Sequence, residues 1–117
     1  MAENFDPKDG GKVPLADAEK WISQFDDDER RDKEKDTISV FFGKEFLKSI
    51  FEEAPECAGI SFFLSKKHSD FAGKAVMNLV LIPRKADGTL IYSNMSEGKD
   101  AAIQYVWDSG KVCPPTC

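Results

Sequence analysis

The stretch GKAVMNLVLIPRKADGTLIY, residues 73–92, decides the fold of this chain. Residues 73–84 place valine, leucine, isoleucine and methionine on both faces of an extended strand. A strand that is apolar on both faces is typical of the centre of a sheet, where each face is covered. The pair Asp87-Gly88 follows, and such a pair readily adopts the positive φ angles of a tight hairpin turn. We therefore expect residues 89–92 to pair back antiparallel on this strand.

Two helices and further strands are predicted before this stretch. A helix that begins near Pro14 is indicated by an apolar stripe at helical spacing, which must pack on another element. The stripe consists of Leu15, Ala18, Trp21, Ile22 and Phe25. Residues 37–42 favour a short strand, a second amphipathic helix ends before Pro55, and residues 57–67 favour another strand. The sequence thus predicts an α+β fold, with two helices packed on one face of a three- to four-stranded, mainly antiparallel sheet.

Length and composition predict one domain with a short tail at each end. The chain has 117 residues, of which 41% are hydrophobic and 32% are charged, as in an ordinary globular domain. Residues 1–12 are polar and rich in glycine, so we expect a flexible N-terminal tail. Residues 13–110 form the single α+β domain, and residues 111–117 form a Cys-Pro-Pro-Thr-Cys tail. Every residue of 26–36 is charged, which predicts a charged helix end or a linker.

Charge and hydropathy exclude several classes of function. The formal net charge of -5 argues against nucleic-acid binding, which depends on clustered lysine and arginine. The apolar runs are too short to span a bilayer, and the N-terminus has no signal-peptide pattern, so we expect a cytoplasmic protein without a membrane partner. Residues 101–107 fit a short helix or an edge strand equally well. The sequence does not specify an oligomeric state.

No pattern in the sequence indicates an enzyme. The chain has one histidine, His68, in a lysine-rich segment that we expect to form a turn, and such a loop lacks the rigid support that a catalytic triad needs. Phosphate-binding, dinucleotide-binding and metalloprotease motifs are absent from the sequence. No catalytic or cofactor-binding residue is therefore predicted.

The last seven residues, KVCPPTC, contain the sharpest chemical pattern in the chain. A disulfide between Cys113 and Cys117 needs Cα atoms about 4.4 to 6.8 Å apart, but Pro114 and Pro115 favour an extended backbone, which disfavours a local bond. A redox motif would need a two-residue spacer at a helix N-terminus, so a thiol redox protein is only an alternative. A stiff, accessible tail suits recognition by a partner protein. We therefore expect a small non-enzymatic interaction or accessory protein whose functional element is this tail.

A zinc-binding protein is a second alternative. Cys57, His68, Cys113 and Cys117 together would supply the three thiolates and one imidazole of a tetrahedral zinc site. Structural zinc sites mostly use tight pairs of ligands at both ends, and only the terminal pair approximates one. The competing interpretation makes Cys57 a small buried apolar residue and His68 a solvated one.

The order of the motifs resembles a family of short uncharacterised bacterial proteins. The shared features are PLADAEKWISQF, the helix start FFGKEFLKSIF, CAGISFFL, a strand pair closed by ADGTL, and a C-terminal CPPxC tail. The resemblance implies a shared architecture over most of residues 14–117, and it supplies no catalytic residue. Cys57, Gly59, Cys113 and Cys117 match its pattern. This chain departs from the pattern in its longer charged stretch at 26–36 and in extra residues before the tail, which leave the spacing between sheet and tail open.

Overall fold

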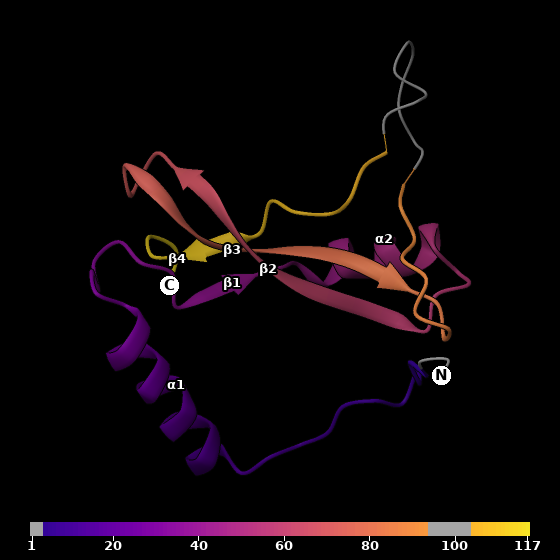
Figure 1. Ribbon diagram of the computed structural model, residues 1–117, viewed down its shortest axis with the longest axis horizontal. Helices are drawn as coiled ribbons and strands as arrows, with labels where there is room; N and C mark the ends of the chain where they lie inside the picture. The colour runs from indigo at the N-terminus through magenta and orange to yellow at the C-terminus, as the bar shows by residue number, and fades with distance from the viewer. Residues whose placement is uncertain (1–3, 94–103) are drawn as a thin grey trace. The chain divides into compact units, whose positions relative to one another are not determined.

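A computed structural model describes residues 4–93 and 104–117. It contains two helices and four strands within these residues, in an α+β arrangement, which confirms the predicted class (Figure 1). The elements are α1 (Leu15–Glu29), β1 (Ser39–Phe41), α2 (Lys44–Glu53), β2 (Gly59–Ser69), β3 (Lys74–Arg84) and β4 (Lys111–Cys113). The strands form two sheets of two strands each, β1 with β4 and β2 with β3, in place of the single sheet that the sequence predicts.

The chain divides into two compact units. Of the described residues, 4–9, 42–64, 79–93 and 104–110 belong to the first unit. Residues 10–41, 65–78 and 111–117 belong to the second. The β2–β3 hairpin contributes one half of its length to each unit. Within the described residues, neither helix combines the length and apolar character needed to cross a lipid bilayer.

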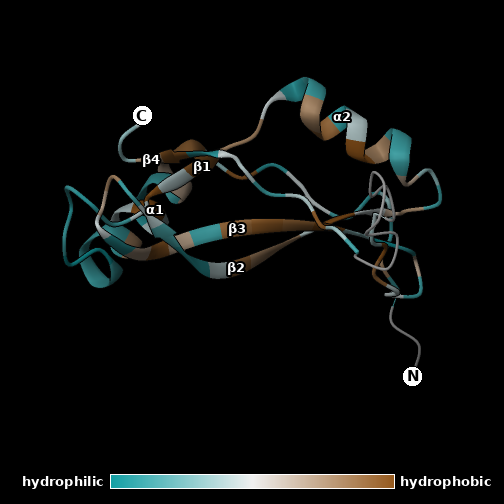
Figure 2. Ribbon diagram, turned by 90° about the horizontal axis from the view of Figure 1, so that it is seen from above, coloured by the Kyte–Doolittle hydropathy of each residue, from teal (hydrophilic) through white to brown (hydrophobic). Residues whose placement is uncertain are grey.

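The first unit contains residues 79–84, the second half of β3. Figure 2 shows much of this strand in the brown of hydrophobic residues. Leu81 is completely buried, and its N–H and C=O both hydrogen-bond to the backbone of Trp107, at 2.8 and 3.2 Å. β3 therefore has a backbone neighbour on both sides at this point, as expected of a central strand. The one-residue bridge to Trp107 is too short to add a strand to the sheet.

The predicted hairpin after β3 is confirmed. The N–H of Gly88 donates to Lys85 O at 2.9 Å, and Gly88 has a φ of 94°, which glycine adopts without steric cost. Leu90 then bridges back antiparallel to Arg84. A second antiparallel bridge joins Ser93 to Tyr105. Of the ambiguous segment 101–107, residues 101–103 lie outside the described part of the chain.

The amphipathic pattern of α2 explains its burial. Ile50 is fully buried and Phe46 is half-buried, while the charged residues of the helix remain exposed. Figure 2 shows hydrophobic and hydrophilic residues alternating along α2. Phe42, just before the helix, stacks on Phe46 with ring centroids 5.8 Å apart and meets Phe62 of β2 edge-on at 6.4 Å. Ala54 ends the helix, and its N–H donates to Ile50 O. Aromatic contacts therefore tie the start of α2 to β2 within the first unit.

Residues 5–9, which the sequence assigns to a flexible tail, make specific contacts in the first unit. The N–H of Phe5 donates to Ala86 O at 2.8 Å, and the guanidinium of Arg84 lies 4.9 Å from the Phe5 ring centroid. Asp6 and Asp9 close a turn, since Asp9 N–H donates to Asp6 O at 2.9 Å. Phe5 thus supplies apolar surface that orders this segment. The prediction of a flexible tail considered only the polar and glycine content of residues 1–12.

In the second unit, helix α1 does not bury the stripe that was expected to pack. None of its residues is buried, and Leu15, Trp21 and Ile22 are 73%, 59% and 56% exposed. The prediction was wrong on packing because amphipathic spacing shows which face is apolar without showing what covers that face. Within the second unit, only Ala18 and Phe25 of this stripe are half-buried, and the rest stays exposed.

Candidate functional site

The C-terminal segment closes into a small ring, residues 113–117, which we call the C-terminal ring. A disulfide joins Cys113 to Cys117, whose Cα atoms lie 4.8 Å apart. The N–H of Thr116 donates to Val112 O at 3.1 Å, which adds a hydrogen bond across the base of the ring. Cys113 is buried, whereas the last three residues are exposed. One cysteine of the bond therefore faces the interior of the second unit, and the other faces solvent.

This disulfide corrects the expectation that the two prolines would keep the cysteines apart. That expectation rested on the extended backbone that Pro114 and Pro115 favour. The Cα atoms of Cys113 and Cys117 nevertheless lie 4.8 Å apart, within the range of a disulfide. The segment therefore turns back on itself between the two cysteines.

The ring is anchored through β4. β4 pairs antiparallel with β1, with Ser39 opposite Cys113 and Phe41 opposite Lys111, and Figure 1 shows the two strands side by side near the C-terminus. The N–H of Ile38 also donates to Cys113 O at 2.8 Å. Phe41 is 66% exposed and lies on the same face of this sheet as Cys113, because residues two apart in a strand share a face. An exposed aromatic side chain therefore borders the ring.

Cys57 lies in the first unit, just after α2. Its N–H donates to Ala54 O at 3.1 Å, and the residue is half-buried. Burial raises the pKa of the Cys57 thiol, and the nearby carboxylate of Glu56 raises it further. Because the thiolate is the reactive and metal-binding form, these surroundings disfavour both reaction and metal binding at Cys57.

His68 lies on β2 in the second unit, where the sequence predicts a turn. It is exposed, and its Nε2 is 3.3 Å from Asp70 Oδ1. Of the four predicted zinc ligands, the structure joins only Cys113 and Cys117, as a disulfide. In residues 4–93 and 104–117, no three His, Cys, Asp or Glu side chains are grouped so that they could hold a metal ion. The zinc site stays a prediction for a reduced form of the chain.

The charged segment forms an ordered cluster of hydrogen bonds and ion pairs around Arg30, which we call the Arg30 knot. The sequence did not predict this cluster. Its helical part continues α1 to Glu29, and the Arg30 side chain is only 10% exposed. Arg30 donates from Nε to Asp36 O and from Nη2 to Lys33 O, each at 2.8 Å, and pairs through Nη1 with the carboxylate of Asp26. This segment contains charges of both signs and no apolar residue, so it has no apolar periodicity. Nothing in its sequence therefore marks one arginine as the centre of the cluster.

Carboxylates complete this knot. Hydrogen bonds from Arg30 and then Lys33 lower the pKa of Asp26. Lys74 of β3 pairs with Asp36 at 2.8 Å, and this hydrogen bond lowers the pKa of Asp36. The hydroxyl of Thr37 is buried and donates to Met77 O at 2.6 Å. The segment that follows α1 is thus fastened to β3 within the second unit.

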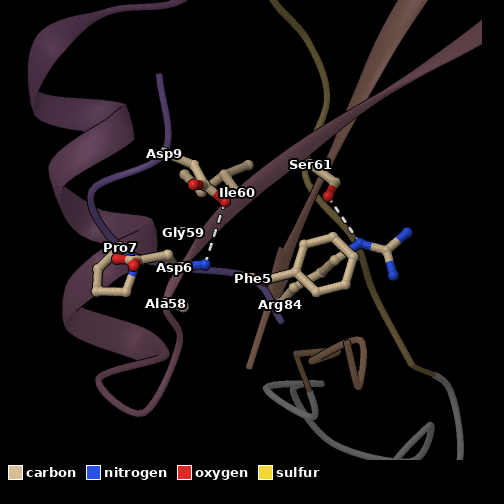
Figure 3. Close-up of a pocket in the computed structure, with 9 residues that line it drawn as sticks. All are labelled: Phe5, Asp6, Pro7, Asp9, Ala58, Gly59, Ile60, Ser61 and Arg84. Atoms are coloured by element: carbon tan, nitrogen blue, oxygen red, sulfur yellow. Dashed lines mark hydrogen bonds between the residues drawn. The ribbon is translucent and has the colours of Figure 1, made fainter. Parts of the chain in front are cut away.

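A hollow of about 180 Å³ lies beside the N-terminal segment of the first unit (Figure 3). Arg84 lines it and donates from Nε to Ser61 Oγ at 2.7 Å and from Nη1 to Gly88 O at 3.0 Å. The carboxylates of Asp6 and Asp9 line the same hollow. Because both charge signs are present and Arg84 is held by its own contacts, the hollow favours neither an anion nor a cation. We assign Arg84 a structural role.

Comparison with protein-family models, with curated proteins and with solved structures finds no match. The resemblance to short bacterial proteins with a CPPxC tail therefore stays a prediction. Function has to be argued from the side chains that the chain displays.

Proposed function

We propose that this chain is a small non-enzymatic interaction module that presents its C-terminal ring to a partner protein. The proposal rests on the difference in solvent exposure between the two ends of the ring. Cys113 is 7% exposed and fixed by strand pairing, while Pro115, Thr116 and Cys117 stand in solvent. A surface that is ordered before binding loses little conformational entropy when a partner binds it.

The neighbourhood of the ring supports contact with a protein. Phe41, on the same face of the β1–β4 sheet as Cys113, offers exposed aromatic surface beside the ring. Aromatic side chains are enriched at protein interfaces, where they contribute a large share of the binding energy. The ring with Phe41 therefore supplies both a fixed shape and an apolar anchor.

Quantitative cross-linking of the full chain to proteins in a cell extract tests this proposal, with matched variants. Cys117→Ser opens the ring, Phe41→Ser removes the anchor, and Leu64→Ser changes an exposed apolar residue elsewhere, on β2. We expect at least one protein to be cross-linked by the wild type and by Leu64→Ser, and lost with both other variants. Identical sets for the wild type and Cys117→Ser would refute the proposal.

A thiol redox protein is a second candidate, and the disulfide itself favours it. An external dithiol could attack the sulfur of exposed Cys117, forming a mixed disulfide and releasing Cys113 as a thiol. The second external thiol then displaces Cys117, so the dithiol is oxidised and both ring cysteines are reduced. Exchange with dithiothreitol, followed by alkylation and intact mass, measures this reaction. A rate no higher than that of oxidised glutathione would count against redox function.

A further inference from the structure

Within the second unit, helix α1 displays an apolar face that is largely exposed. We call this the α1 face; it consists of Leu15, Ala18, Trp21, Ile22 and Phe25. Three of these side chains are more than half exposed, and none is buried. Trp21, Ile22 and Phe25 also border an open hollow of about 300 Å³ together with Ile38. Exposed apolar patches of this kind mark interaction sites.

The helix needs a partner surface for its own stability. An isolated helix of this length is marginal in water, and most helices gain their stability by packing an amphipathic face. At its C-terminal end, α1 is held by the Arg30 knot, which contacts Asp26. The knot fixes where the helix ends, and it leaves Leu15, Trp21 and Ile22 more than half exposed. A cover of the α1 face would therefore stabilise the helix as well as bind it.

Acidic side chains border the α1 face on both sides. Residues three and four apart are neighbours on a helix surface. Asp17 precedes Trp21 by four residues, and Asp28 follows it by two turns on the same side of the stripe. Glu19 lies three residues before Ile22, on the opposite side. Among the described residues, Asp17, Glu19 and Asp28 take part in no ion pair.

These two acidic rims argue against a second copy of the chain as the occupant. Two α1 faces packed against each other, parallel or antiparallel, would bring Asp17, Glu19 and Asp28 of one copy against the acidic rims of the other. Like charges across an interface are unfavourable and select against that pairing. The net charge of -5 for the whole chain adds to the repulsion. A partner that complements these charges would instead carry basic residues along the borders of its binding surface.

We infer that the α1 face docks into an apolar groove bordered by lysine and arginine on a partner protein. The binding mode is an amphipathic helix in a groove, with Trp21 as the central anchor and Ile22 beside it. Tryptophan is the residue type most often found at the energetic centre of an interface. The rims would steer the approach and fix the register of the helix. This inference does not depend on the C-terminal ring, so either surface can fail alone.

The test uses the full chain and a synthetic probe. The probe is a fluorescein-labelled helical hairpin of two leucine/lysine amphipathic helices, which offers an apolar groove with lysine rims. Fluorescence anisotropy measures its affinity. Trp21→Ala should weaken binding about tenfold or more, which is the effect of losing one interface anchor. The double variant Asp17→Lys and Asp28→Lys should weaken it by a similar factor and flatten its dependence on salt.

A matched pair of leucines supplies the control. Leu15 on α1 and Leu64 on β2 are each 73% exposed. Leu15→Ser should weaken binding of the probe severalfold, while Leu64→Ser should leave it unchanged. Circular dichroism on each variant checks that the helices remain, and the rim variant, which changes only surface charges, keeps the test valid if an apolar substitution unfolds α1.

Several results would overturn the inference. One is that a control hairpin of serine and lysine, with the same charge as the probe, binds with equal affinity. Attraction between charges would then explain the binding without the apolar face. Another is an affinity that Trp21→Ala and the rim variant leave unchanged, or that Leu64→Ser lowers as much as Leu15→Ser does. The last is a concentration-dependent dimer in sedimentation that Trp21→Ala dissociates, which would make a second copy the occupant.

Discussion

Strand β3 and helix α1 each carry a clear apolar pattern in the sequence, yet they differ in how the fold uses it. β3 buries Leu81 completely and has backbone neighbours on both sides at that residue. α1 is longer, and none of its residues is buried. Apolar surface in β3 is therefore buried in the fold, whereas much of the apolar surface of α1 stays exposed. The strength of an apolar pattern does not distinguish these uses.

The largest effect should come from truncating the same residue type in each element. Leu81→Ala should lower the free energy of unfolding by about 2 to 5 kcal/mol, because it leaves a cavity at a buried site. Leu15→Ala should change it by no more than about 0.5 kcal/mol, as is usual at exposed positions. Urea unfolding of the two variants measures both. Similar losses would mean that α1 is packed after all.

The Arg30 knot sharpens the comparison, because it is where α1 acquires tertiary contacts. Arg30→Ala removes the donors to the carbonyls of Asp36 and Lys33, and we expect a loss of about 2 kcal/mol in unfolding free energy. Arg31→Ala changes an exposed neighbour and should cost almost nothing. Hydrogen exchange should show faster opening of the last turn of α1 only in the first variant. Equal hydrogen-exchange rates in the two variants would show that the Arg30 knot does not stabilise the last turn of α1.

A smaller effect is expected at Thr37, which fastens the segment after α1 to β3. Thr37→Val keeps the shape and removes the hydroxyl that donates to Met77 O, leaving a carbonyl unpaired in a buried position. The expected loss is about 1 to 2 kcal/mol. Thr116→Val makes the same change at an exposed threonine and should be neutral. If the two variants unfold at the same urea concentration, the hydrogen bond contributes nothing net.

The smallest expected effect is a loss of stability at acidic pH. The hydrogen bond from Lys74 lowers the pKa of Asp36 in the folded chain. The unfolded chain then takes up this proton first, so the stabilisation is present above about pH 4 and is lost as pH falls through the folded pKa. Carbon-detected NMR titration should show the pKa of Asp36 returning towards its ordinary value in Lys74→Ala. An unchanged titration would exclude Lys74 as the cause.

Part of this structure follows from local sequence patterns. The positions of α1, α2, β3 and the turn at Asp87-Gly88 were predicted, since periodicity and turn chemistry act over a few residues. The sequence did not predict the separate β1–β4 sheet. That pairing joins segments far apart in the chain, and each strand has only three residues. A three-residue strand gives too short a pattern to identify its partner.

The candidate sites were predicted less well than the fold. The sequence singled out the two terminal cysteines, but the extended backbone that the two prolines favour led to the wrong expectation for the bond between them. The Arg30 knot depends on which acid meets which base, and a run of eleven charged residues allows many pairings. The exposure of Trp21 is a tertiary property, and helical spacing does not determine it.

The pairing of β1 with β4 sets the order in which the chain can assemble as it is synthesised. Val40 pairs with Val112, about 70 residues further along the chain, so loop closure makes this contact slow to form. Until the ribosome has made residues 111–113, β1 remains a short unpaired edge with an exposed Phe41. During that interval β1 is open to binding by chaperones and to pairing with the wrong chain.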